Sequence, residues 1–209
     1  MARVRFAASA ALVLLLLLGS SAHGPSPAAP WLEARPAAAV GWPVSSGLVV
    51  AEVVTGGASA SDEYVELYNG SAAPVDLAGL EVAYVTSSGA TVTRKTAWTG
   101  SLPVEPGRHV LLANALGAYA AIADATWSGG FAATGGSVVL RPIGGTPIDA
   151  VGWGDAVNAF VEGAPAPAPA AGRSIERLPG GPAGNGVDTN DNEADLSVKS
   201  GLTLEEIAA

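Results

Sequence analysis

The acidic segment 188–195, with the sequence DTNDNEAD, carries the side chains best suited to binding a metal ion. Its carboxylate and amide oxygens stand at alternate positions, which suits Ca²⁺. The pattern then breaks, because Glu193 stands where a calcium loop needs glycine and Lys199 where a bidentate glutamate would close the site. Asp and Asn side chains also cap backbone N–H groups two residues along the chain. We therefore expect a structural loop, with Ca²⁺ binding as the alternative; its candidate ligands are Asp188, Asn190, Asp191 and Asp195.

Histidine, the usual general base and transition-metal ligand, occurs only twice. Cleavage after Ala22 would make His23 the N-terminus, and an N-terminal histidine paired with a second histidine can hold copper. The Gly-Pro-Ser-Pro sequence after His23 gives such a site no rigid support. His109 follows the Pro106-Gly107 turn and is interpreted as a surface residue. Apart from the Ca²⁺ alternative, we expect no cofactor.

Paired carboxylates could carry acid–base catalysis of the glycosidase type, which needs two carboxyl groups about 5 to 9 Å apart across a cleft. Glu63 and Glu66 form such a pair in sequence, but residues three apart on a strand face opposite sides of a sheet. The sequence has no G-x-S-x-G, P-loop or H-E-x-x-H motif. It has no cysteine either, which excludes a thiol nucleophile and an iron–sulfur cluster. We therefore expect that the protein is not an enzyme.

Exposed aromatic side chains would indicate carbohydrate binding, because sugar rings stack on flat apolar surfaces. The candidates are Trp98, Trp127 and Trp153, although a β-sandwich core commonly buries one or two tryptophans. The Pro-rich segment 164–172 cannot pair in the centre of a sheet and is predicted to be an extended loop.

The charge balance limits the choice of partner. Ten Lys and Arg residues against nineteen Asp and Glu residues give a net charge of −9, and loss of Arg3 and Arg5 makes it −11. Because so acidic a chain repels phosphate backbones, we expect no nucleic-acid partner.

Arg3 and Arg5 precede an apolar stretch, residues 10–18, that is too short to span a membrane. With the small residues that follow, this pattern is typical of a signal peptide cleaved after Ala22 or Gly24. We expect a secreted protein, extracellular or at the cell surface, with no membrane anchor after cleavage. The Ala-, Gly- and Pro-rich composition suggests a bacterial source.

Residues 23–46 are rich in proline and alanine and are predicted to be an extended linker, from which Trp31 or Trp42 could pack on the domain. Short runs rich in Val, Leu, Tyr and Thr follow, separated by Gly, Ser, Pro and Asn, and they predict an all-β sandwich of about eight strands. Leu116, Tyr119 and Ile122 favour one short helix over 115–125. The predicted strands are 48–54, 63–68, 80–86, 91–98, 109–113, 137–142, 147–153 and 174–178.

Four segments then resemble a known family in order and spacing. They are DEYVELYNGSAAPVDLAGLEV (62–82), LPVEPGRHVLLA (102–113), GGSVVLRPIGGTPIDAVGWG (135–154), and RSIERLPGG with DTNDNEADLSV (173–198). Together they are similar to a lamin-tail domain of the exported bacterial type, over about residues 47–198. The resemblance implies an immunoglobulin-like β-sandwich that acts in protein interaction or scaffolding. Exported bacterial relatives often accompany hydrolases or nucleases without catalytic residues of their own.

The resulting organisation is a signal peptide (1–22), a linker (23–46), a lamin-tail-like β-sandwich (47–198) and a C-terminal tail (199–209). The expected function is binding or scaffolding, with a protein or an envelope polysaccharide as partner. The alternatives are a Ca²⁺-stabilised adhesion domain and an accessory module of a secreted hydrolase or nuclease. The resemblance assigns structural roles to Glu52, Glu66, Asn69, Asp76, Gly79, Arg177, Asp188, Asn192 and Asp195. For Glu52 and Glu66, which lie within apolar strands, a ligand contact is the alternative.

Arg177 is predicted to lock the end of the domain. A guanidinium offers five donors in a planar fork, which suits a bidentate carboxylate. The nearest acids after the turn at 179–186 are Asp188, Asp191 and Asp195, so we expect one of them to pair with Arg177.

Overall fold

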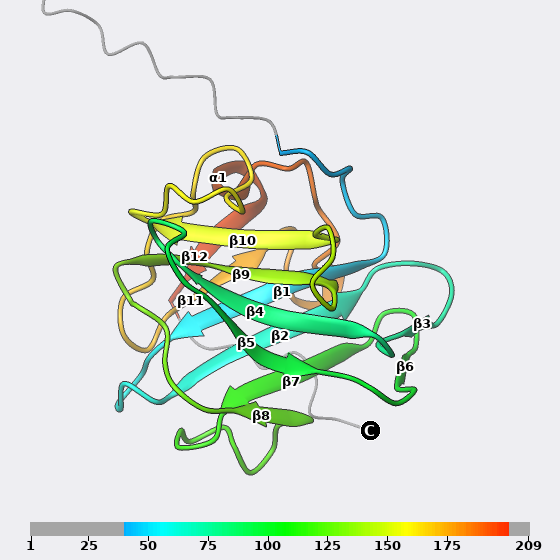
Figure 1. Cartoon of the computed structure of the whole chain (residues 1–209), viewed down its shortest axis with the longest axis horizontal. Coiled ribbons are helices and arrows are strands. Elements are labelled where there is room, and N and C mark those ends of the chain that lie inside the picture. The colour runs from blue at the N-terminus through cyan, green and yellow to red at the C-terminus, as the bar shows by residue number, and fades with distance from the viewer. Residues whose placement is uncertain (1–39, 201–209) are drawn as a thin grey trace, which may run out of the picture. The chain divides into compact units, whose positions relative to one another are not determined.

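The computed structural model describes residues 40–200 of the chain, and its regular secondary structure is almost entirely β (Figure 1). One short α-helix, α1 (Asn192–Asp195), and one 3₁₀ turn, η1 (Gly181–Ala183), lie near the C-terminal end. The strands are β1 (Leu48–Thr55), β2 (Glu63–Asn69), β3 (Val75–Asp76), β4 (Leu80–Thr86), β5 (Val92–Ala97), β6 (Pro103–Val104), β7 (His109–Asn114), β8 (Ala125–Trp127), β9 (Gly135–Pro142), β10 (Asp149–Gly154), β11 (Ser174–Arg177) and β12 (Leu196–Lys199).

The strands form two main sheets. The larger has the order β12-β11-β1-β2-β7-β8 and the smaller the order β10-β9-β4-β5, while β3 and β6 pair separately. The β7–β8 pair is parallel and the other strand pairs are antiparallel. The structure therefore confirms the predicted all-β, immunoglobulin-like sandwich.

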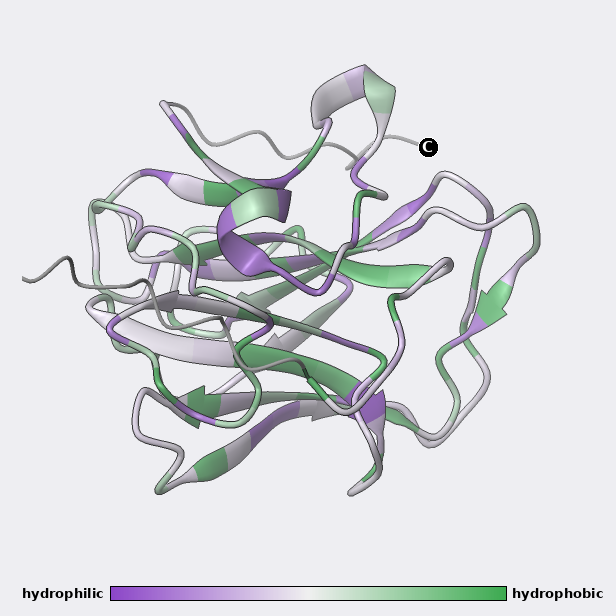
Figure 2. Ribbon diagram, turned by 90° about the horizontal axis from the view of Figure 1, so that it is seen from above, coloured by the Kyte–Doolittle hydropathy of each residue, from purple (hydrophilic) through white to green (hydrophobic). Residues whose placement is uncertain are grey.

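The core lies between the two sheets and follows from alternation along the strands. In β2, Val65 and Leu67 point into the core, with Val82 and Leu140 from the smaller sheet. Figure 2 shows hydrophobic residues concentrated along the strands. Because a chain without cysteine has no disulfide cross-links, this buried apolar surface supplies most of its stability.

Loops cover parts of the outer faces of both sheets. Trp42 packs with Val139 and Ala150 on the smaller sheet, so Trp42 does dock on the domain. On the larger sheet the turn region 115–124 covers Tyr64, whose ring meets that of Tyr119 edge-on with centroids 4.9 Å apart.

All eight predicted strands occur, with ends shifted by up to two residues. Four further strands, β3, β6, β8 and β12, have only two to four residues. So short a strand is too brief to show an alternating pattern, and it forms only because a neighbouring strand is already in place.

The prediction of a helix over 115–125 is wrong, because these residues form consecutive turns that lead into β8. Leu116 is 85% exposed, so the three-residue spacing does not mark a buried face. A Cβ at Gly117 would lie 1.9 Å from the carbonyl oxygen of Ser61, and Asp62 accepts a hydrogen bond from the N–H of Ala118. The turns therefore pack against the loop between β1 and β2 through Gly117 and Ala118.

The Pro-rich segment 164–172 is an extended loop, as predicted. It lies beside the edge strand β10, where Ala166 forms a single parallel bridge with Trp153. Its prolines cannot extend this pairing, so the segment covers an open sheet edge. Among residues 40–200, no helix is long and apolar enough to cross a membrane.

Candidate functional site

Arg177, at the end of β11, is fully buried between the two sheets and lies at the centre of the most extensive polar network. Its Nη2 lies 2.8 and 3.0 Å from the two carboxylate oxygens of Asp149 on β10. Its Nε donates to the carbonyl of Val50 at 3.0 Å, and Nη1 donates to that of Val187 at 2.9 Å. The guanidinium therefore joins strands of both sheets.

A β-bulge in β1 lies beside this arrangement. The register between β1 and β2 shifts between Val50 and Glu52, so Ala51 has no partner in β2, and β11 pairs with β1 only at Glu52 and Val53. The N–H of Val50 then donates to Asp149 at 2.5 Å, while its carbonyl accepts from Arg177. The backbone of Val50, next to the bulge, therefore bonds to both members of the ion pair.

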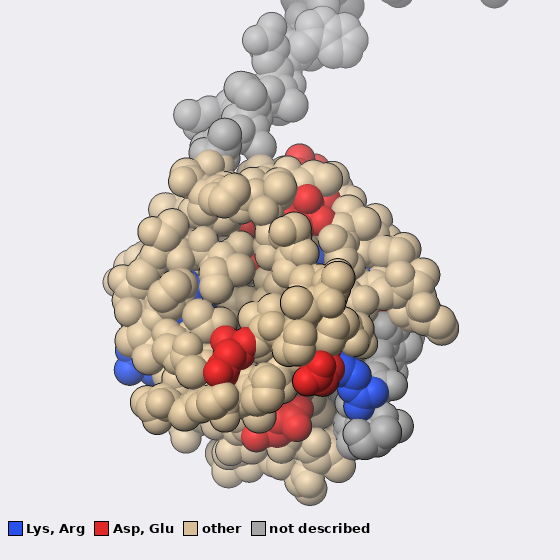
Figure 3. Space-filling view, turned by 90° about the vertical axis from the view of Figure 1, so that its right-hand side faces the viewer, with Lys and Arg blue, Asp and Glu red and all other residues tan. Residues whose placement is uncertain are grey.

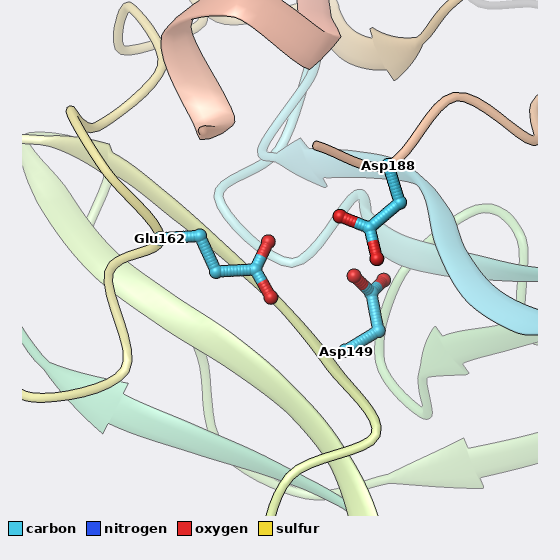
Figure 4. Close-up of side chains that lie close together, drawn as sticks. All are labelled: Asp149, Glu162 and Asp188. Carbon is cyan, nitrogen blue, oxygen red and sulfur yellow. The ribbon is translucent and has the colours of Figure 1, made fainter. Parts of the chain in front are cut away.

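Three more carboxylates surround the pair. Nη1 of Arg177 lies 3.7 Å from Asp188 and 3.6 Å from Asp195. Asp149, Asp188 and Glu162 point toward one another (Figure 4), with one oxygen of each within 4.8 Å of the others. Within the described residues, this is the one group of three side chains of His, Cys, Asp or Glu that lie close enough together to hold a metal ion.

Burial dominates the electrostatics of this cluster. It raises the pKa of Asp149 to about 6, against the opposite effect of Arg177, and it raises the pKa of Glu162 to about 8, with the charge of Asp149 adding to the shift. Burial alone would lower the pKa of Arg177, but the surrounding carboxylates raise it. Arg177 therefore stays charged, and Glu162 takes up a proton near neutral pH.

Glu162 and Asn192 connect the cluster to the segment before β1. Glu162 accepts from Nε1 of Trp42 at 3.0 Å and from the N–H of Ala150 at 3.1 Å. The amide of Asn192 donates to Ala150 and Glu162 and accepts from the N–H groups of Gly152 and Glu162, so all four of its bonds are made. These contacts, and the bond from the N–H of Ser45 to Asp188, fix residues 42–45 on the sandwich.

This cluster has the properties of a structural lock rather than of a reactive centre. The guanidinium of Arg177 already occupies the position beside Asp149 that a cation would take. The carboxyls of Asp149 and Glu162 are also fully buried, so neither can reach a substrate from solvent. Arg177 pairs with a carboxylate, as predicted, but the prediction of Asp188, Asp191 or Asp195 as bidentate partner is wrong, because Asp149 takes that place. The stabilising role of Arg177 stays a prediction.

Three of the four candidate calcium ligands, Asp188, Asp191 and Asp195, already accept hydrogen bonds from protein donors. Asp188 accepts from the N–H groups of Ser45 and Asn190, and the side chain of Asn190 donates to the carbonyl of Trp42. Asp191 caps α1 through the N–H of Ala194, and Asp195 accepts from the N–H and hydroxyl of Thr189. The oxygens of Asp188, Asp191 and Asp195 thus accept from backbone donors, as in Asx loops, whereas Oδ1 of Asn190 is buried and has no hydrogen-bond partner among the described residues.

The other residues singled out from the sequence lie apart from this cluster. Glu52 and Glu66 are buried directly opposite each other in the β1–β2 register. Glu63 lies on the other face of β2 and accepts from the N–H of Phe131 and the amide of Asn114, so Glu63 and Glu66 form no dyad. Burial raises the pKa of Glu63.

Asn69, Asp76 and Gly79 stabilise turns. Asn69 is fully buried and donates to the carbonyls of Ala73 and Val104. Asp76 accepts from Ser101 and from the N–H groups of Ala78 and Leu102, which lowers its pKa. Gly79 has a φ of +81°, a conformation that strongly favours glycine.

The three candidate tryptophans provide no exposed platform, and Trp31 lies outside the described residues. Trp127 and Trp153 are buried in the core and Trp98 packs against it. A half-buried aromatic pair lies elsewhere: Tyr68 and His109 are cross-strand neighbours in β2 and β7, with ring centroids 4.7 Å apart. His109 is half-buried, with Nε2 3.0 Å from the side-chain oxygen of Asn185. The sequence analysis assigned no role to Tyr68.

Tyr68 and His109 line a hollow of about 540 Å³ together with Gly107 and the loop 181–184. A smaller hollow of about 210 Å³ also includes His109 and is lined by residues 102–105, Arg108, Val110 and Asp124. We call these two hollows together the β7 groove.

Comparisons with known proteins agree with the fold. The model of the Lamin Tail Domain family matches residues 43–155. Among solved structures, the crystal structure of a DUF4876 family protein from Bacteroides thetaiotaomicron VPI-5482 is similar, with a TM-score of 0.52 and 14% identity over 73% of this chain and 71% of that one. At this identity the likeness concerns the fold alone. No curated protein matches the sequence significantly.

Proposed function

The chain belongs to the lamin tail domain family, and on that basis we propose that it is an exported, non-catalytic module that binds a protein or a cell-envelope polymer. The observation that carries the proposal is the contrast between its two polar regions. The buried cluster around Arg177 is closed to solvent, whereas the β7 groove is open and has a volume typical of ligand sites.

The distribution of cations supports a partner other than nucleic acid. Arg177 and Lys95 are buried, Arg94 and Arg141 pair with Glu81, and Lys199 pairs with Glu176. Figure 3 shows isolated Lys and Arg side chains on a mostly uncharged face. Phosphate binding needs several cations in one place, so duplex DNA should not bind even at low salt.

The experiment is a binding assay with the chain from Pro25 onward, immobilised and mixed separately with envelope fractions and secreted proteins of the producing organism. Saturable capture that persists at high salt, with no turnover in a metal-supplemented screen of phosphoesters and glycans, is the expected result. Capture of a hydrolase or nuclease would assign the accessory role. Absence of any saturable partner, or turnover by the pure chain, would overturn the proposal.

A further inference from the structure

The two hollows of the β7 groove are neighbours, because His109 lines both. One side is formed by the loop 181–184 and the other by residues 102–105. A recess in two compartments suits a linear ligand that places successive units on either side of His109, rather than one compact molecule.

The larger compartment is lined by the partly exposed ring of Tyr68, against which glycine backbone packs closely. Three glycines approach Tyr68, and a Cβ at Gly184 would lie 2.7 Å from its hydroxyl oxygen and one at Gly70 3.2 Å from its ring. Gly184 has a φ of +83°, which strongly favours glycine. The C–H faces of sugar rings pack on such aromatic surfaces.

The smaller compartment adds polar groups of both signs. Glu105 and Asp124 can accept hydrogen bonds from hydroxyl groups, and Arg108 can donate them. Since no group of cations lines either compartment and the chain carries −9, the groove favours an uncharged, hydroxyl-rich ligand over an anion.

The position of the groove argues against a peptide. Extended peptides are commonly bound by pairing with the open edge of a sheet. Tyr68 lies on β2, an interior strand, and the register pairs it with Val49 of β1 on one side and His109 of β7 on the other. Recognition at Tyr68 must therefore use its side chain and ring, whereas β8 pairs with β7 only from Leu112 to Asn114, beyond His109.

We propose that the β7 groove binds a linear, uncharged polysaccharide, whose sugar rings stack on Tyr68 and His109. This inference rests on the proposed function and narrows its partner from a protein or polymer to a glycan chain.

The test is co-sedimentation of the chain from Pro25 onward with insoluble cellulose, chitin, β-1,3-glucan and peptidoglycan sacculi. Saturable binding to at least one glycan is expected, and Tyr68→Ala should weaken it about tenfold. Tyr68→Phe keeps the aromatic ring, so its affinity for the glycan should stay near that of wild type. Val157→Ala, which changes an exposed apolar residue outside the groove, is the matched control.

A second variant separates loss of binding from loss of folding. Ala183→Arg adds bulk to the groove at an exposed position without removing a core contact, so it should abolish binding while the melting temperature stays unchanged. Wild-type affinity in both Tyr68→Ala and Ala183→Arg would overturn the inference.

Envelope fractions treated with protease or with periodate, which cleaves vicinal diols, separate this inference from the proposed function. Binding that survives protease and is lost with periodate supports a glycan. Binding lost only with protease would overturn the glycan and leave the binding module standing. No binding to glycans or to untreated fractions would overturn both.

Discussion

Arg177 and Asp149 lie in different sheets of the sandwich, yet Nη2 of Arg177 is 2.8 Å from one carboxylate oxygen of Asp149 and 3.0 Å from the other. Both side chains are fully buried. A buried pair contributes little net stability compared with an apolar pair of the same size, but removal of one partner leaves the other charge uncompensated. The ion pair therefore holds the two sheets in one relative arrangement.

Arg177→Ala should lower the free energy of unfolding by about 3 to 5 kcal/mol. It removes the partner of Asp149 and leaves the carbonyls of Val50 and Val187 without their donor. Urea unfolding monitored by tryptophan fluorescence measures the loss. Arg173→Ala, at an exposed arginine four residues earlier, is the control and should cost under about 1 kcal/mol. Equal losses in the two variants would show that Arg177 is not a lock.

The sequence predicts the eight longer strands because each has enough residues to show alternation and is bounded by turn residues. It does not predict α1, whose four residues depend on the Asp191 cap and on tertiary bonds from Asn192. The helix expected over 115–125 fails because a three-residue spacing cannot distinguish a buried helix face from a loop whose apolar contacts with the sheet come from Tyr119 and Ala123.

The lock was predictable in part. Arg177 in a strand next to an acidic loop indicated an ion pair, but spacing favours local partners, and Asp149 lies 28 residues earlier on another sheet. The same limit applies to the β7 groove. Tyr68 and His109 are 41 positions apart, and only the register of β2 and β7 brings their rings together.

Calcium should not stabilise the protein. The oxygens of Asp188, Asp191 and Asp195 already accept hydrogen bonds from backbone N–H groups, and the loop would have to rearrange to bind an ion. We expect the same melting temperature in excess Ca²⁺ and in chelator, for wild type and for Asp191→Asn alike. A saturable rise in wild type that Asp191→Asn abolishes would assign a metal site to this loop.

Lys95 should stabilise the corner where β5 meets the loop after β8. Its Nζ donates to the carbonyls of Gly129 and Gly130 at 3.1 Å and lies 5.1 Å from the ring centre of Phe131. Burial lowers the pKa of Lys95, and the charge of Glu63 opposes that shift.

Lys95→Met keeps much of the volume but loses both hydrogen bonds, so unfolding should be easier by about 1 to 3 kcal/mol in a urea titration. Arg94→Ala is the matched control, because Arg94 is largely exposed and Arg141 remains beside Glu81. A Lys95→Met variant as stable as wild type would show that the corner does not need its cation.

Export should leave a shortened chain. Since the basic and apolar N-terminal pattern predicts cleavage after Ala22 or Gly24, intact-mass measurement of secreted material should give an N-terminus at His23 or Pro25. These residues lie outside the described part of the structure. Secreted protein that retains Met1 would contradict the prediction.

The stability of the domain should fall as pH rises from 5 to 8. The pKa of Glu162 is about 8 in the folded protein against an ordinary value of 4.5, and that of Asp149 is about 6 against 3.8, burial being the main cause for both. Between the ordinary pKa of each group and its raised pKa in the folded protein, the folded state holds a proton that the unfolded state has released. The free energy of unfolding therefore decreases with pH, by at most about 1.4 kcal/mol per pH unit for each group.

Glu162→Gln isolates this effect because glutamine cannot ionise. The variant loses some stability at every pH, since its amide N–H₂ faces that of Asn192, but its free energy of unfolding should fall less steeply than that of wild type. Urea titrations at intervals from pH 5 to 8 measure the two slopes, and their difference cancels the contribution of every other titrating group. Glu193→Gln, at an exposed acid on α1, should keep the wild-type slope. Parallel curves for wild type and Glu162→Gln would mean that Glu162 is already ionised in the folded protein, held by its bonds from Trp42, Ala150 and Asn192.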